Sequence, residues 1–98
     1  MVYSSMRIEW DHPKERINIR KHGVPFSLAA EIFDDPLHLS VLDKRFTFFE
    51  ERWITIGATK DLFLLVVAHL AFSEEGEEVI HIISAREATR YEQRQYGK

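Results

Sequence analysis

Histidine, arginine and lysine side chains at a few places in this 98-residue chain have the chemistry for acid–base catalysis and phosphate binding. The sequence contains no glycine-rich phosphate loop, no HExxH pair and no nucleophile elbow, so these candidates lack a local motif. It also contains no cysteine, which excludes a disulfide framework and a thiolate metal site. The candidates are two histidines near an acidic turn and several cations at the ends of predicted elements.

The two histidines, His69 and His81, lie on either side of an acidic stretch. If residues 73–77 form the turn of a hairpin, Phe72 lies opposite Glu78 and the two histidines face each other. Such a pair can supply a general base and a general acid, because imidazole titrates near neutral pH. The pattern fits two half-buried structural histidines better, and a one-residue shift of the turn would separate them. A metal site is disfavoured because no third ligand is specified.

Ser84 and Arg86 stand at the junction of the last predicted strand and the last predicted helix. Ser84 and Glu87 match a capping box, which predicts that the helix begins at Ala85. A cation does not stabilise the N-terminus of a helix, but an arginine there can join the backbone amides in binding a phosphate. An ion pair with a nearby acid explains Arg86 equally well.

Lys21 and His22 come directly before Gly23 in the segment RKHGVPF. A glycine followed by a proline ends a helix, and cations are favourable at a helix C-terminus, so helix capping explains these residues without a function. Arg52 opens a predicted strand beside two glutamates, and a local surface ion pair would contribute little to stability.

Charge is unevenly distributed along the chain, although the net charge is only −3. Residues 1–22 and 84–98 each carry a net charge of +2, whereas residues 23–83 carry −7. An acidic protein is not a general nucleic-acid binder, but two basic ends that meet in space would form a local basic surface. Solvated helix faces are the alternative explanation.

The predicted elements form one α+β domain over residues 1–98. Apolar residues make up 45% of the chain and charged residues 30%, the usual balance for a soluble globular protein. Residues 1–5 carry no pattern and are expected to be a ragged start, and residues 6–10 alternate as a short strand.

Two short helices are expected after this strand. Asp11 is the predicted N-cap of the first, with Pro13 in its first turn, and Gly23 ends it after about Lys21. Only a thin apolar stripe lies on this helix, so it should be largely exposed. Ser27 is the expected N-cap of the second helix, which the following Asp-Asp-Pro stops.

Four later segments have the apolar pattern of strands, and short connections predict that they form an antiparallel meander: 37–42, 51–59, 62–72 and 79–84. The third is nearly all apolar and should be the central strand. A final helix is predicted over residues 85–95. No segment is apolar for long enough to span a bilayer and no signal peptide is recognisable, so we expect a cytoplasmic protein without membrane contact.

Four ordered segments of the chain resemble the BrnT toxins of bacterial type II toxin–antitoxin systems. They are WDHPKERINIRKHGVPFSLAAEIFDDP, ERWITIG, LLVVAHL and HIISAREATRYEQRQY. The resemblance implies a RelE-like fold and an endoribonuclease that inhibits translation by cutting RNA. It also implies a hetero-oligomer with a BrnA-like antitoxin, through which alone the protein would contact promoter DNA.

On the matching positions, the resemblance implies these site residues: Lys21, His22, Arg52, Ser84 and Arg86. Such toxins often carry an arginine where this chain has His81 and a tyrosine where it has His69. RNA can be cut by attack of its own 2′-hydroxyl without a metal or cofactor, given a base, an acid and cations on the phosphate. We expect His69 or His81 to transfer protons, and Arg90 to join the other cations in phosphate binding. The alternative is a non-catalytic RelE-like module that only binds a partner.

Overall fold

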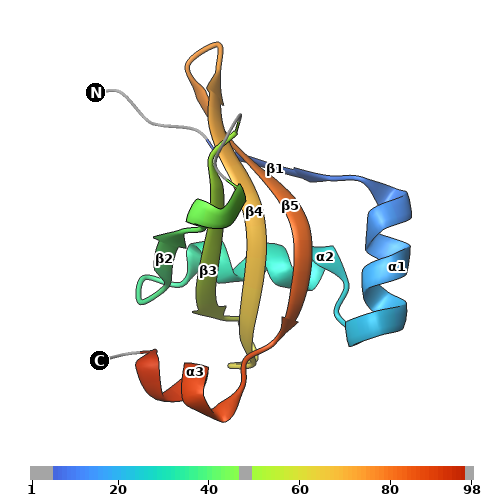
Figure 1. Cartoon of the computed structure of the whole chain (residues 1–98), viewed down its shortest axis with the longest axis vertical. Coiled ribbons are helices and arrows are strands. Elements are labelled where there is room, and N and C mark those ends of the chain that lie inside the picture. The colour runs from blue at the N-terminus through green and yellow to red at the C-terminus, as the bar shows by residue number, and fades with distance from the viewer. Residues whose placement is uncertain (1–5, 47–49, 97–98) are drawn as a thin grey trace.

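Five strands form one mixed sheet at the centre of the molecule (Figure 1). The computed structural model describes residues 6–46 and 50–96. The order across the sheet is β1-β5-β4-β3-β2, in which β2 to β5 are antiparallel neighbours and β1 runs parallel to β5. The α+β class is confirmed, and the meander accounts for four strands: β2 (Leu39–Leu42), β3 (Arg52–Ala58), β4 (Leu64–Glu74) and β5 (Glu77–Glu87), with β1 (Met6–Trp10) at the edge.

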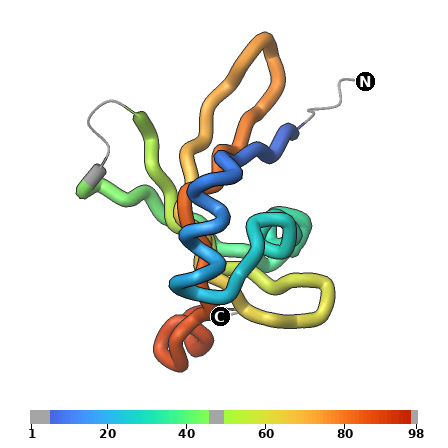
Figure 2. The backbone as a smooth tube through the Cα atoms, turned by 90° about the vertical axis from the view of Figure 1, so that its right-hand side faces the viewer, coloured from blue at the N-terminus to red at the C-terminus, as the bar shows by residue number. Residues whose placement is uncertain are grey.

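The helices lie on one face and at the margins of the sheet. Helix α1 (His12–His22) stands beside β5, and α2 (Phe26–Ala29) continues into a 3-10 helix, η1 (Ala30–Asp34), behind the sheet in Figure 1. Figure 2 shows the molecule from the side of α1, with α2 on one side of the strands. A further 3-10 turn, η2 (Lys44–Phe46), follows β2, and α3 (Arg90–Gln95) lies below the sheet.

The core fills the space between α2, η1 and one face of the sheet, which we call the helix face. Its buried side chains include Phe26, Ile32, Val67 and Ile82. Gly57 of β3 allows this close packing, because a Cβ there would lie 2.9 Å from the Cβ of Ile32. The glycine of the ERWITIG segment therefore has a structural explanation.

The start of the second helix differs from the prediction. Pro25, not Ser27, occupies the N-cap position, and α2 begins at Phe26. The amide of Phe26 donates to a carboxylate oxygen of Glu15 in α1 at 2.7 Å. The capping acceptor thus comes from another helix, which a local sequence pattern cannot reveal.

Asn18 attaches α1 to the sheet and is the one buried side chain of this helix, which is described along its whole length. Its Nδ2 donates to the carbonyl of Ala85 at 2.8 Å and to that of Val24 at 3.0 Å, and its Oδ1 accepts from the amide of Ala85 at 3.0 Å. Strand β1 pairs with β5 only over residues 78–82. The Asn18 amide therefore takes the place of a strand on the β1 side of β5, beyond the end of β1, while the rest of α1 is largely exposed, as expected.

The turn between β4 and β5 is shorter than predicted. Only Glu75 and Gly76 lie between the strands, with φ angles of +50° and +81°, as in a two-residue type I′ turn. Phe72 consequently lies opposite Val79 instead of Glu78. This one-residue shift moves His81 out of register with His69, so the predicted facing pair is wrong.

The end of β5 also differs from the prediction. The ladder with β4 continues to Glu87, so Ser84 and Arg86 lie in a strand, and the predicted capping box at Ser84 is wrong. The capping box that forms joins Thr89 and Glu92, at the start of α3. Pairing with β4, together with the Asn18 contact at Ala85, keeps this stretch extended.

Two expectations concern the limits of the chain. The expected ragged start at residues 1–5 lies outside the described residues. Within the part of the chain that the structure describes, no helix has the length and apolar character needed to cross a membrane.

Replacing Asn18 with alanine should lower the free energy of unfolding by about 2–4 kcal/mol, because three backbone groups would lose a buried hydrogen-bond partner. Urea denaturation of the purified protein measures this change. Arg16→Ala, at an exposed position of the same helix, is the control and should change the value by less than about 0.5 kcal/mol. Equal stability of Asn18→Ala and the control would contradict the proposed role of Asn18.

Candidate active site

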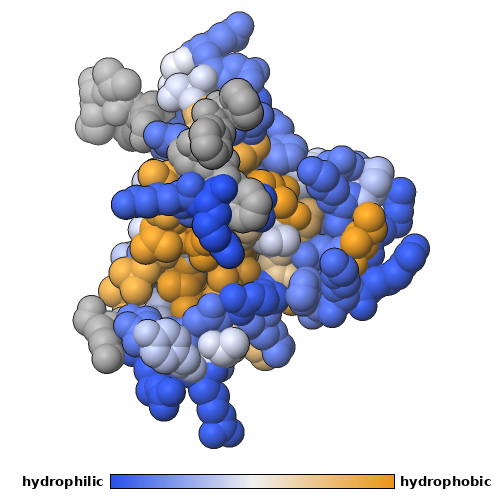
Figure 3. Space-filling view, viewed as in Figure 1, coloured by the Kyte–Doolittle hydropathy of each residue, from blue (hydrophilic) through white to orange (hydrophobic). Residues whose placement is uncertain are grey.

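Strand pairing places four of the predicted site residues on the face opposite α2 and η1, which we call the front face: Arg52, His81, Ser84 and Arg86. Residues directly opposite each other share a face, so Arg52, Leu70 and His81 form a row that continues to Glu9 on β1. This face is turned to the viewer in Figures 1 and 3. Arg52 and His81 are thus brought together across the sheet.

Ser84 and Arg86 occupy the next rows of the front face, toward α3. Ser84 pairs with Ala68 and Arg86 with Val66. Residue Ile83 is an extra residue of β5, because the pairing shifts between Ala68 and the next residue of β4. The bulge places Ser84 on the same face as His81 despite their odd spacing.

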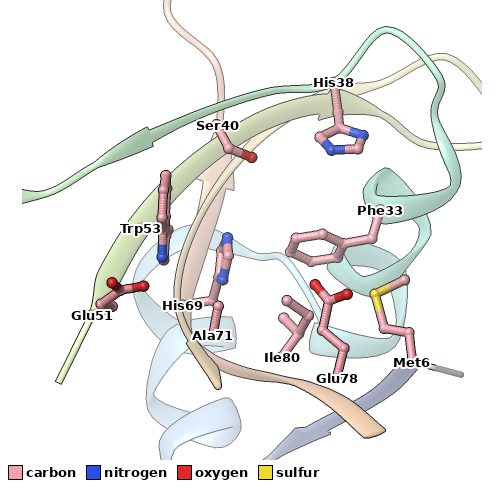
Figure 4. A pocket seen from close by; sticks show the side chains of 10 residues that line it. All are labelled: Met6, Phe33, His38, Ser40, Glu51, Trp53, His69, Ala71, Glu78 and Ile80. Atoms are coloured by element: carbon pink, nitrogen blue, oxygen red, sulfur yellow. The ribbon is translucent and has the colours of Figure 1, made fainter. Parts of the chain in front are cut away.

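His69 lies on the helix face, away from the other candidates (Figure 4). It is only 3% exposed, and its ring packs edge-on against Phe33 at a centroid distance of 4.9 Å. Its Nε2 is 2.7 Å from Oγ1 of Thr55, which is 2.7 Å from Oγ of Ser40. Burial lowers the pKa of His69, because it disfavours the charged ring. The geometry therefore favours the structural interpretation of this histidine.

Lys21 and His22 face β5 across a groove of about 190 Å³. The residues that line it come from one stripe of α1 and from two positions of β5: Lys14, Ile17, Asn18, Lys21, His22, Ile83 and Ser84. Gly23 has a φ of +71° and donates its amide to Ile19, so the helix ends here as predicted. The same turn is both a helix end and one wall of a groove whose lining includes Lys14 and Lys21.

Arg86 forms the ion pair that the sequence left as one of two interpretations. Its Nη1 and Nη2 donate to the two carboxylate oxygens of Glu92 at 2.7 and 2.8 Å, and Nη1 also donates to the carbonyl of Glu87. The hydrogen bonds from Arg86 lower the pKa of Glu92 to about 2. These contacts fix the guanidinium between the end of β5 and α3, and its remaining N–H groups can still bind an anion. Arg90 is exposed at the first position of α3.

Arg52 lies at the far end of its row, on β3. Its Nε is 4.0 Å from Oδ2 of Asp43, a buried carboxylate that also accepts two side-chain hydrogen bonds from Arg45. Hydrogen bonding from Arg45 holds the pKa of Asp43 below its usual value. This cluster holds a cation at the margin of the front face.

Apolar side chains form the floor between these polar groups, as the orange area of Figure 3 shows. Three of them are substantially exposed, with exposed fractions of 42% for Leu39, 62% for Val41 and 40% for Phe72. The front face therefore combines an exposed apolar floor with cations along β5 and α1. Among the residues that the structure describes, no group of three or more His, Asp or Glu side chains has an arrangement suited to a metal ion.

Known proteins identify the family. Residues 10–92 match the model of the family described as the ribonuclease toxin, BrnT, of type II toxin-antitoxin systems. The chain belongs to the BrnT family. Every candidate residue from Lys21 to Arg90 lies inside the match, and membership of a type II system implies an antitoxin partner.

The crystal structure of the Brucella abortus ribonuclease toxin BrnT, determined at 1.1 Å resolution, is similar to this BrnT-family chain. The two share 30% sequence identity and a TM-score of 0.60, over 88% of this chain and 100% of that one. No curated protein is significantly similar to the chain.

Sequence reasoning missed four residues that shape the site. Asn18 and Lys14 share a helical stripe with Lys21, a spacing that the sequence contains but that only the contact with β5 makes meaningful. Glu92 could have been found, because Thr89 and Glu92 match the capping pattern. Glu9 had no local signal, since the parallel pairing of β1 with β5 joins residues 72 positions apart.

Glu92→Gln should lower the free energy of unfolding by about 1–2 kcal/mol at pH 7, a value reduced for solvent screening of the partly exposed pair. The folded-state pKa of about 2 lies below the ordinary 4.5, so the stabilisation is complete above pH 4.5 and is lost as the pH falls toward 2. Denaturation of the wild-type protein and the variant between pH 2 and 7 should show that the difference in their free energies of unfolding narrows as the pH falls from 4.5 toward 2. Glu87→Gln, at an exposed neighbour, is the control, and a difference independent of pH would contradict the account.

Proposed function

We propose that this BrnT-family chain is the toxin of a type II toxin–antitoxin system and acts as a metal-independent endoribonuclease with a RelE-like fold. Cutting RNA would inhibit translation in the cytoplasm. The observation that carries the proposal is the cationic groove of Lys21 and His22 against Ser84, with Arg86 in the adjoining row of the front face. Membership of a family described as ribonuclease toxins supports it.

The proposed reaction is attack of a 2′-hydroxyl on the neighbouring phosphorus, with departure of the 5′-oxygen. Because the nucleophile belongs to the RNA, the protein needs only to move protons and to stabilise negative charge on the phosphate. Lys21 and Arg86 are placed to hold the phosphate, since both border the end of β5. Ser84 lines the groove with Lys21, and Arg52 on β3 and Arg90 on α3 would be further cations for the RNA backbone.

The apolar floor suits the rest of an RNA strand. Bases stack on aromatic side chains, and Phe72 is an exposed aromatic residue of this floor, while the phosphates would remain near the cations. Leu70 lies in the row of Arg52 and His81, and Phe72 lies two residues further along β4 on the same face. A single-stranded segment could therefore cross the front face with its phosphates toward α1.

A BrnA-like antitoxin would neutralise the toxin by binding it in a hetero-oligomer, and any contact with promoter DNA would be made by the antitoxin. The exposed side chains of Leu39, Val41 and Phe72 are consistent with such a protein partner. The alternative function, a non-catalytic partner-binding module, is favoured by one observation: Arg86 is already paired with Glu92.

Lys21→Ala and Arg86→Ala should each reduce RNA cleavage by about 10²–10³-fold, because each removes a cation from the developing charge on the phosphate. Cleavage of an end-labelled RNA by purified protein in EDTA measures the effect. Lys60→Ala, at an exposed position of the β3–β4 connection, should retain full activity. Unchanged cleavage in both site variants would contradict the assignment of the groove.

The nature of the RNA ends tests the reaction type. Attack by the 2′-hydroxyl leaves a cyclic phosphate and a 5′-hydroxyl, and a single 2′-deoxy substitution at the cleaved position should abolish cleavage there. Cleavage of the deoxy-substituted bond would refute this mechanism. Absence of cleavage by the wild-type chain on ribosomal, messenger and transfer RNA would instead favour the partner-binding module.

A further inference from the structure

Glu9 and His81 form a carboxylate–imidazole pair at directly opposite positions of β1 and β5. The Nδ1 atom of His81 lies 2.8 Å from Oε2 of Glu9. The side chain of His81 is 24% exposed and that of Glu9 is 39% exposed, so the pair is open to a ligand on the front face. Within the described residues, this is the shortest distance between a histidine ring nitrogen and a side-chain carboxylate oxygen.

The hydrogen bond determines which ring nitrogen is available for chemistry. The hydrogen bond from His81 holds the pKa of Glu9 below its usual value, so Glu9 is an ionised acceptor near neutral pH. Nδ1 must therefore carry a proton, which leaves Nε2 of the neutral ring with a free electron pair. This is the tautomer that a general base requires.

Arg7 limits the freedom of the carboxylate. Its Nη2 lies 3.3 Å from Oε1 of Glu9, and its Nη1 donates to Glu77 at 2.9 Å. One oxygen of Glu9 is thus held by Arg7 and the other by His81. Arg7 and Glu9 on β1, together with Glu77 on β5, therefore hold the imidazole of His81 in place.

His81 borders a cavity of about 560 Å³ that Leu70 and Phe72 also line. Arg52 lies two strands away in the same row, roughly 10 Å between Cα atoms at the usual strand spacing. The charged groups around the ring are Glu9 and Arg7 on β1, Arg52 on β3, and Glu50 and Glu51 at the cavity. A phosphodiester beside His81 would have the base next to it, Arg52 across β4, and the groove of Lys21 and Ser84 further along β5.

We propose that His81 is the general base of the reaction and that Glu9 is its positioning residue, a proposal that rests on the ribonuclease function. Nε2 of His81 accepts the proton of the 2′-hydroxyl as the 2′-oxygen forms its bond to phosphorus. The bond from phosphorus to the 5′-oxygen breaks, and the 5′-oxygen takes a proton from water. His81 then returns its proton to solvent, so the protein is regenerated.

Single-turnover cleavage from pH 5 to 9 tests the base. The wild-type cleavage rate should rise with pH to a plateau. His81→Gln should lack this rise and should cleave about 10²-fold more slowly. Glu9→Gln should lower kcat about tenfold with little change in KM, and should have no further effect in the His81→Gln background. Glu78→Gln, on the other face of the same strand, is the control and should cleave normally. Additive effects of the two substitutions, or an unchanged pH limb in His81→Gln, would overturn the proposal.

Nitrogen NMR of the imidazole provides a readout that does not need activity. His81 should show the Nδ1-protonated tautomer in the wild-type protein and a mixture of tautomers in Glu9→Gln. The Nε2-protonated form in the wild-type chain would overturn the pair even if RNA is cleaved. Wild-type protein with the expected tautomer but no cleavage of any RNA would instead refute the ribonuclease function.

Discussion

The arrangement of the site depends on the side-chain amide of Asn18, which makes the backbone hydrogen bonds that a neighbouring strand would otherwise make. Asn18 satisfies both backbone groups of Ala85 on the side of β5 that β1 no longer covers, and this is the buried contact that holds α1. Lys21 and His22 follow Asn18 by three and four residues, so they share its face of the helix and lie against β5. A largely exposed helix can therefore present Lys21 and His22 in a defined place.

The front face is assembled by a second constraint, the bulge at Ile83. Alternation along a regular strand would send His81 and Ser84 to opposite faces, because their spacing is odd. The extra residue restores them to one face and leaves Ala85 turned toward the core. The bidentate contact with Glu92 then orients Arg86. The front face is thus formed by β5, the end of α1 and the Arg86–Glu92 ion pair.

The sequence predicted what local patterns determine. Gly23 ends α1 as expected, and the apolar segment around Val67 is the central strand. The length of the β4–β5 turn could not be predicted from the sequence, because an acidic stretch with one glycine permits more than one register. The predicted pairing of His69 with His81 depended on that register and was therefore wrong. The sequence also contains two capping patterns near its end, Ser84 with Glu87 and Thr89 with Glu92. The long-range contacts of Ala85 keep the first pattern in a strand, so the helix is capped by Thr89.

The central claim is that RNA binds the front face beside the end of α1. The most direct test is to map backbone amide shifts on titrating the protein with a short RNA whose 2′-hydroxyls are methylated. The account predicts shifts concentrated at Lys21, His22, His81, Ser84 and Arg86. Shifts confined to the helix face, around Phe33 and His69, would contradict it.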